Sequence, residues 1–347
     1  MKRLVLLAPL LLGAALAQTT TPPNLTLQSA VQSALTVGST VRDAQAGVTS
    51  AAATLKAVQA DPSSLAGDLL SAQQADALAR AQLAQARLVA VQSAINAYTT
   101  VYQNQEQLKV DALQVQVNQK ALQVAQVKLS TRAGTALDVK TAQNTLASSQ
   151  QTLSDDRKAL GVNTTKLANA IGRTGSFVVA VPPTPPAVKS GAALASGYPT
   201  LLSAQQAVET AALNVKLADN EFTARVTLND ARTRLSNAQS QLSSTQKDIQ
   251  TTLATALRSA QNAQAGLQTA IQAEANAQAS TSQDAVRLKS GTISAVQYQQ
   301  SQLALQKAHF ARAQALVSLW QALATLSVNS GEDNTGFVAS TAPAASR

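Results

Sequence analysis

The chain has 347 residues and a formal net charge of +9, with no cysteine and with aromatic side chains at only 3% of its positions. The lack of cysteine excludes disulfide bonds, thiolate metal sites and cysteine nucleophiles. So few aromatic side chains do not fill a thick core, whereas alanine and leucine are enough for the narrow contact between two long helices. We therefore expect an all-α protein of packed helices and no enzymatic activity.

Residues 1–17 have the pattern of a secretory signal peptide. Lys2 and Arg3 precede an apolar stretch that ends in the A-x-A-like cleavage site Ala15-Leu16-Ala17. This stretch is shorter than the roughly 20 residues that a membrane-spanning helix needs, and no later segment reaches that length. Export, together with the lack of basic runs interleaved with aromatic residues, argues against a nucleic-acid partner. We interpret the positive charge as a solvated face.

Proline and glycine divide the mature chain into two repeats joined by a linker. Repeat 1, residues 18–181, is expected to form helices over about 26–60, 63–131 and 136–172. The run Pro-Pro-Thr-Pro-Pro then predicts a proline-rich linker over residues 182–198. The first repeat is therefore one long helix with a shorter helix on either side of it in the sequence.

Repeat 2, residues 199–331, follows the same plan, with helices expected over about 199–223, 228–289 and 293–330. The remaining residues, 332–347, are small and polar and are expected to form a disordered tail. In both repeats the two short helices together match the long helix in length, so they can lie end to end beside it. At about 1.5 Å per residue, each long helix would reach roughly 100 Å.

The first long helix carries small and apolar residues at alternating spacings of four and three. This seven-residue pattern is typical of long antiparallel hairpins that pack like coiled coils. The positions are Ala77, Ala81, Ala84, Leu88, Val91, Ile95, Tyr98 and Tyr102.

The two halves also resemble each other in sequence. A shift of 157 residues places Gly134 on Gly291 and Arg132 on Lys289, and further upstream a shift of 160 places Val41 on Leu201. Two unrelated helices rich in alanine and glutamine would also show some similarity. A glycine shared at the same break favours a tandem duplication instead.

Two segments carry a resemblance to a known family. Residues 132–146 (RAGTALDVKTAQNTL) and 289–303 (KSGTISAVQYQQSQL) resemble the G…DV..A…L element of the TolC family of outer-membrane efflux proteins. Residues 25–34 resemble the opening helix of that family, and 198–201 resemble the start of its second repeat. The resemblance implies a TolC-like α-barrel protomer and a homotrimer. It also implies partnership with a periplasmic adaptor (membrane fusion protein) and an inner-membrane pump.

One departure from the family concerns its membrane part. The family inserts two membrane strands between the first short helix and the long helix of each repeat, and each such strand needs about 9–11 residues of alternating polarity. Residues 61–74 show no alternation, and residues 220–230 have room for one short strand over 222–228. We therefore expect little or no β-barrel. The expected location is the outer membrane or the periplasm. The shortness of these two segments argues against insertion of the chain into the membrane.

The resemblance also suggests candidate site residues at the periplasmic tip. It places Gly134 and Gly291 at the two turns and makes Asp138 the matching carboxylate, with Ala295 at the corresponding position of the second repeat. A ring of three Asp138 side chains would favour cations at a constriction. The alternative is that Asp138 caps a helix, where its charge is favourable beside the helix N-terminus.

No residue pattern suggests a catalytic, metal or cofactor site. His309 is the only histidine, and no second ligand stands at metal-binding spacing from it. The leading hypothesis is a passive duct of a tripartite efflux or type I secretion system. The alternative is a non-transporting α-helical spacer that bridges envelope layers. A periplasmic adaptor is the weakest hypothesis, because the flanking β-rich domains of such a protein are missing.

Overall fold

We describe a computed structural model of the chain over residues 24–174, 177–191 and 193–338. Its helices are α1 (Leu27–Val37), α2 (Ser39–Ala60), α3 (Ala66–Ser130), α4 (Ala136–Ala170), α5 (Pro199–Ala218), α6 (Arg225–Lys289) and α7 (Ala295–Ser330). Two short strands, β1 (Asn24–Leu25) and β2 (Val178–Val179), pair in parallel. The all-α expectation is confirmed, while the predicted signal peptide lies outside the described residues.

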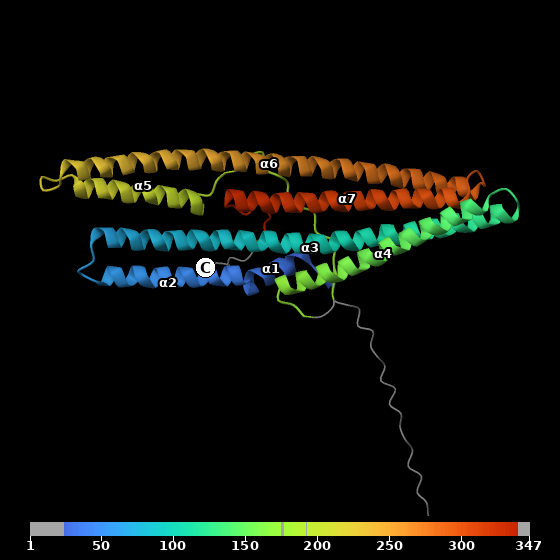
Figure 1. The fold of residues 1–347 in the computed structure, drawn as a ribbon, viewed down its shortest axis with the longest axis horizontal. Helices are drawn as coiled ribbons and strands as arrows, with labels where there is room; N and C mark the ends of the chain where they lie inside the picture. The colour runs from blue at the N-terminus through green and yellow to red at the C-terminus, as the bar shows by residue number, and fades with distance from the viewer. Residues whose placement is uncertain (1–23, 175–176, 192, 339–347) are drawn as a thin grey trace, which may run out of the picture.

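The helices form a long rod of antiparallel hairpins (Figure 1). The long helices α3 and α6 have 65 residues each, so each is about 100 Å long. Along α3 lie α1 and α2 towards one end and α4 towards the other, and α5 and α7 lie along α6 in the same way. We call the end with turns 131–135 and 290–294 the tip end, and the end with turns 61–65 and 219–224 the blunt end.

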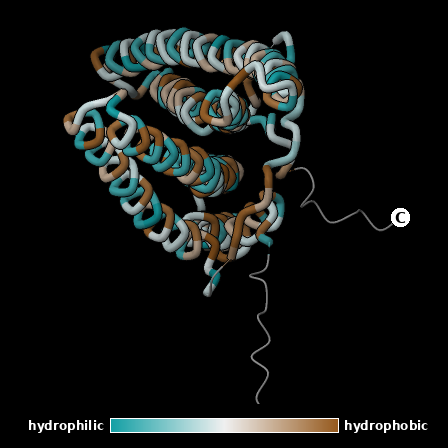
Figure 2. Tube along the Cα trace, turned by 90° about the vertical axis from the view of Figure 1, so that its right-hand side faces the viewer, coloured by the Kyte–Doolittle hydropathy of each residue, from teal (hydrophilic) through white to brown (hydrophobic). Residues whose placement is uncertain are grey.

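The rod is built as successive rows of helices. Helix α3 packs against α2 and α4 on one side and against α7 and α5 on the other, whereas α6 packs mainly against α5 and α7. Viewed from one end in Figure 2, the rows follow one another instead of surrounding one central core. Helix α6 therefore forms one edge of the molecule, and the row of α2 and α4 forms the other.

The thickest core lies at the middle of the rod, where most of the few aromatic residues gather. Tyr98 is fully buried, and the single proton of its hydroxyl is shared between two carbonyl oxygens beside the strand pair, those of Leu25 (2.8 Å) and Ala180 (2.7 Å). Trp320 donates from Nε1 to the carbonyl of Pro183 at 3.0 Å and stacks on Phe337 with ring centroids 5.4 Å apart. The linker and the end of the chain are thus fastened to the same level of the rod.

Several local expectations are corrected. The first short helix breaks in two at Gly38, where a Cβ would lie 2.4 Å from the carbonyl oxygen of Ala34. The suggested strand at 222–228 is wrong, because α6 already begins at Arg225. The disordered tail is wrong for residues 332–338, where Asp333 accepts backbone hydrogen bonds. The rest of that tail, 339–347, lies outside the described residues.

The coiled-coil pattern of α3 is only partly reflected in burial. Six of its eight positions are buried, but Ala77 and Ala84 are exposed. Towards the blunt end α3 instead buries Ala72, Asp76 and Ala79, because it contacts α5 there as well as α2. None of the helices in the described part of the chain combines the length and the apolar character that crossing a lipid bilayer requires.

Candidate functional site

The two turns at the tip end have the same backbone structure. Helices α3 and α6 are equally long, so Ala66 corresponds to Arg225 and Ser130 corresponds to Lys289. The turn hydrogen bonds follow the same correspondence: the Ala133 amide donates to the Lys128 carbonyl, and the Thr292 amide donates to the Arg287 carbonyl, both at 2.8 Å. At the tip, the sequence shift that relates the two repeats is therefore two residues longer than the shift of 157 inferred from the shared glycine.

This correction changes which residues correspond at the tip. Gly291 has a φ of +74°, and its counterpart is Arg132, which has a φ of +59°. Gly134 lies two residues further along its turn, where a Cβ would come within 3.0 Å of the Lys128 Cβ. Arg132 thus adopts the left-handed conformation that glycine adopts in the second turn, at a cost of roughly 1–2 kcal/mol for a residue with a Cβ.

Asp138 caps the N-terminus of α4. Its Oδ2 accepts from the Thr135 amide and the Thr135 hydroxyl, both at 2.8 Å, and its own amide donates to Thr135 Oγ1 at 3.2 Å. These hydrogen bonds, the backbone bond first, hold the pKa of Asp138 below its usual value. In the second turn Ser294 and Gln297 form the same capping box, so the counterpart of Asp138 is Gln297 and not Ala295.

The surface of the tip end combines basic and apolar side chains. Lys128, Arg132 and Lys289 are all exposed close to the turns. Leu137 is 73% exposed, and Val286 is 65% exposed. A basic and apolar surface is a favourable contact for a partner protein that carries acidic and apolar groups. A ring of Asp138 side chains needs several copies of the chain and stays a prediction.

A polar cluster in the tip half of the rod joins three helices, and sequence reasoning missed it. His309 on α7 contacts Glu274 on α6, with 2.6 Å between Nδ1 and Oε1, and Arg312 contacts the same carboxylate at 3.1 Å. The Nε2 atom of His309 lies 3.7 Å from Glu106 on α3. Burial, and then the charge of Glu106, raise the pKa of Tyr102 to about 12. The cluster holds α3 against the α6–α7 hairpin.

This cluster is predictable in part. Glu274 on α6 and His309 on α7 stand at nearly equal distances along the chain from the turn that joins the two helices, so an antiparallel hairpin places them at the same level. The contact with Glu106 depends on how α3 packs against α7, which the sequence does not determine. Within the described ranges no three residues of the histidine, cysteine, aspartate and glutamate types are grouped so as to hold a metal ion.

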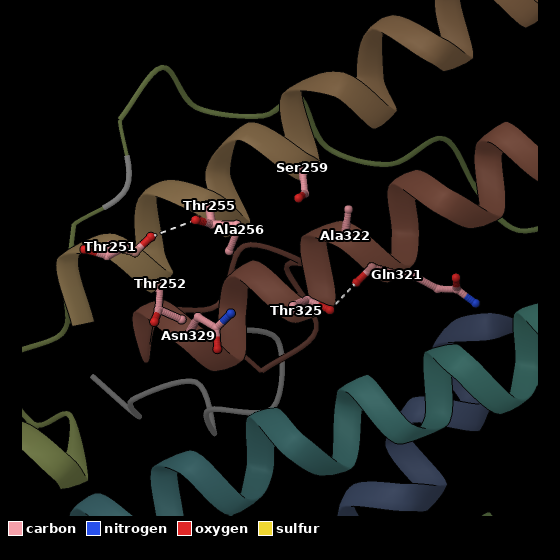
Figure 3. A pocket seen from close by; sticks show the side chains of 9 residues that line it. All are labelled: Thr251, Thr252, Thr255, Ala256, Ser259, Gln321, Ala322, Thr325 and Asn329. Atoms are coloured by element: carbon pink, nitrogen blue, oxygen red, sulfur yellow. Dashed lines mark hydrogen bonds between the residues drawn. The ribbon is translucent and has the colours of Figure 1, made fainter. Parts of the chain in front are cut away.

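A groove between α6 and α7 has a volume of about 530 Å³ (Figure 3). Its wall is neutral, and three of its four threonine hydroxyls donate to carbonyls of their own helix: Thr251 to Lys247, Thr255 to Thr251 and Thr325 to Gln321, each at 2.9 Å. The lining residues are Thr251, Thr252, Thr255, Ala256, Ser259, Gln321, Ala322, Thr325 and Asn329. Such a groove offers water a polar surface without a charge to select a ligand.

Comparison with solved structures identifies the fold. The outer-membrane channel OprN has a TM-score of 0.61 at 16% identity, over 90% of each chain. VceC, an outer membrane protein of Vibrio cholerae, has a TM-score of 0.62 at 15% identity, over 90% of this chain and 96% of its own. The Campylobacter jejuni channel CmeC has a TM-score of 0.63 at 12% identity, over 90% of this chain and 88% of its own.

At these identities the likeness shows the fold alone. No protein-family model matches the chain, and no curated protein matches it. The structural neighbours are outer-membrane channels, and the resemblance to the TolC family is therefore confirmed as a likeness of fold that extends over nearly the whole of the described chain.

Proposed function

We propose that the chain is the duct component of an export system, a passive conduit located in the outer membrane or the periplasm. The observation that supports this most directly is the extent of the structural likeness: about nine-tenths of the chain aligns with 88–96% of the length of three outer-membrane channels. A spacer with no transport role would have no need of this particular order of hairpins. No catalytic step is part of the proposal.

The arrangement of helix rows supports assembly into a closed wall. The protomer has two open edges, α6 on one side and the row of α2 and α4 on the other. Because the two edges differ, contact between copies is head-to-tail, and such contacts close into a ring when the rotation between copies allows it. We propose a homotrimer in which α6 of one copy packs against the α2–α4 row of the next.

We further propose that the tip end faces a periplasmic adaptor, which in turn meets an inner-membrane pump. Exposed basic side chains beside exposed Leu137 and Val286 give this end a surface suited to a protein partner. In the same assembly Asp138 would line the narrow end of the lumen. Its capping role does not prevent this, because the carboxylate stays ionised and exposed.

The absence of cysteine from the chain makes a direct test of the ring possible. One cysteine is placed at an exposed position of α6 and a second at exposed positions of α4 or α2, tried in turn, and the mature protein is oxidised. A closed trimer gives crosslinked products of two and three chains and nothing larger. An open filament would give a ladder, and a monomeric spacer would give no crosslinked product at any pair.

The variants with a single cysteine on α6 are the matched control, because a head-to-tail contact does not bring two copies of the same edge together. Envelope fractionation then separates the remaining alternatives. A trimer that stays with the outer membrane after washing with high salt and urea supports the duct. A soluble monomer in the same experiment contradicts the duct and leaves the spacer as the explanation.

A further inference from the structure

Two carboxyl groups from different helices meet inside the α3–α4 hairpin. Asp111 on α3 and Asp156 on α4 stand at nearly equal distances along the chain from the turn between the two helices, so the hairpin places them at the same level. Asp111 is only 7% exposed. Asp156 is the carboxyl group of α4 that acts on the Asp111 side chain, both as a hydrogen-bonding group and through its charge. The pair is about 30 Å from the tip turn, at 1.5 Å per residue.

The hydrogen bonds of Asp111 leave one of its oxygens without a donor. Oδ1 accepts from Gln107 Nε2 at 2.8 Å, whereas the buried Oδ2 has no hydrogen-bond partner. The groups that act on this carboxyl are Gln107 and Asp156, and no basic side chain is among them. Burial first, and then Asp156, raise the pKa of Asp111 to about 6. Two carboxylates this close repel each other unless a proton or a cation lies between them.

The surroundings of Asp111 are rich in oxygen atoms. A groove of about 590 Å³ opens beside Asp111 between α3 and α4. Thr145, Ser149 and Thr152 donate their hydroxyl protons to carbonyls of their own helix, at 2.8–3.1 Å, so their lone pairs remain available to a ligand. The complete lining is Asp111, Gln114, Asn118, Asn144, Thr145, Ser148, Ser149 and Thr152. It has no positive charge, and its hydroxyl and amide side chains supply oxygen acceptors beside the amide donors.

We propose that a divalent cation of the Ca²⁺ or Mg²⁺ class binds between Asp111 and Asp156 and joins α3 to α4. Both ions take oxygen ligands only, and they accept carboxylate, amide and hydroxyl oxygens together with water. Two carboxylates supply the charge, and the side chains of the groove supply neutral oxygens. Since a site with only two carboxylates is weakly charged, its Kd falls in the range of about 0.1–1 mM, as in extracellular calcium modules.

The cation would act as a reversible clamp on the tip half of the rod. The α3–α4 seam there has few large apolar side chains, and Leu167 is the only residue that α4 buries fully. A bridge between the two helices therefore adds cohesion where packing supplies little. The site is contained within one chain, so it does not depend on the proposed channel function or on trimer formation.

Isothermal titration of the mature protein with CaCl₂, and separately with MgCl₂, tests the proposal. We expect one site per chain for at least one of the two ions. Asp111→Asn and Asp156→Asn should each weaken binding at least tenfold. Asp155→Asn is the matched control, because Asp155 is adjacent on α4 but exposed, and it is already engaged by Gln151 and Lys158. This variant should bind as the unaltered chain does.

A pH series gives a second readout. Lowering the pH from 7.5 to 5.5 should weaken binding, because a carboxyl group must be deprotonated to ligate a cation and protons therefore compete with the ion. Circular dichroism checks that each variant is folded. The proposal is overturned if the unaltered chain binds neither ion up to 10 mM, or if Asp111→Asn leaves the binding unchanged. If both variants misfold, the titration of the unaltered chain can still overturn the proposal, by showing no binding.

Discussion

The left-handed turn at Gly291 allows a test in which one chemical change has opposite effects at two positions. Gly291 has a φ of +74°, and a Cβ built there meets no atom within 4 Å. Gly266 lies within α6, and a Cβ there also meets nothing within 4 Å. Replacing either glycine by alanine therefore changes backbone energetics alone, without a clash or a new contact to confuse the result.

The expected magnitudes follow from the two conformations. At Gly291 the left-handed conformation costs an alanine about 1–2 kcal/mol. The smaller entropy of the unfolded alanine chain returns about 0.4–1 kcal/mol, so Gly291→Ala should destabilise by about 1 kcal/mol. At Gly266 the conformation is helical, and Gly266→Ala should stabilise by about 1 kcal/mol. The two variants should therefore differ by about 2 kcal/mol.

Urea unfolding followed by circular dichroism at 222 nm measures this difference. With an m value of about 3 kcal/mol/M, the two midpoints should lie about 0.7 M apart, on either side of the unaltered protein. Hydrogen exchange of the tip peptides in the same samples shows whether the loss at Gly291 is local. If Gly291→Ala is as stable as the unaltered chain while Gly266→Ala is stabilised, the assigned turn conformation is refuted.

Four further predictions concern single residues. Arg132→Gly should stabilise the chain by about 1 kcal/mol in the same assay, because it relieves a left-handed residue. Because the pKa of Asp138 is lowered on folding, its contribution should be present above pH 4 and lost as the pH falls below it, and Asp138→Asn should abolish this loss in acid titrations. The contribution of Asp111 to stability depends on pH in the opposite direction, because its pKa of about 6 lies above the unfolded value. In cation-free buffer this contribution is fully present below about pH 4, and it is lost as the pH rises through 6. Stability curves of Asp111→Asn should lack this slope. Tyr98→Phe should cost about 1–3 kcal/mol in urea unfolding, because the Ala180 carbonyl loses the Tyr98 hydroxyl as a donor and the buried Leu25 carbonyl keeps only the Ala180 amide.

The helices could be predicted from sequence because the signals that set them are local. Proline and glycine interrupt a helical composition, and the bounds expected for α3 from these breaks lie close to its observed ends, Ala66 and Ser130. Reliance on glycine also explains the error at the tip. The sequence aligns Gly134 with Gly291, whereas the backbone pairs Gly291 with Arg132. No sequence rule predicts an arginine in the left-handed region.

The contacts between helices are much harder to predict. Asp155 and Asp156 are adjacent and therefore do not share a helix face, but the sequence does not show which of them meets α3. The answer depends on the rotation of α4 about its axis, and small residues such as alanine and serine fix that rotation poorly. The same limit applies to His309 and Glu106, whose contact depends on packing between the two halves of the chain.

The placement of the aromatic core at mid-rod has a mechanical consequence. Tyr98, Trp320 and the strand pair fasten the beginning, the middle and the end of the described chain at one level, while the seams on either side rely on small side chains. The rod is therefore stiffest at its centre and most compliant towards its ends, where deformation disturbs the least buried surface. The helices at the tip end can therefore spread apart while the packing at the centre of the rod stays intact.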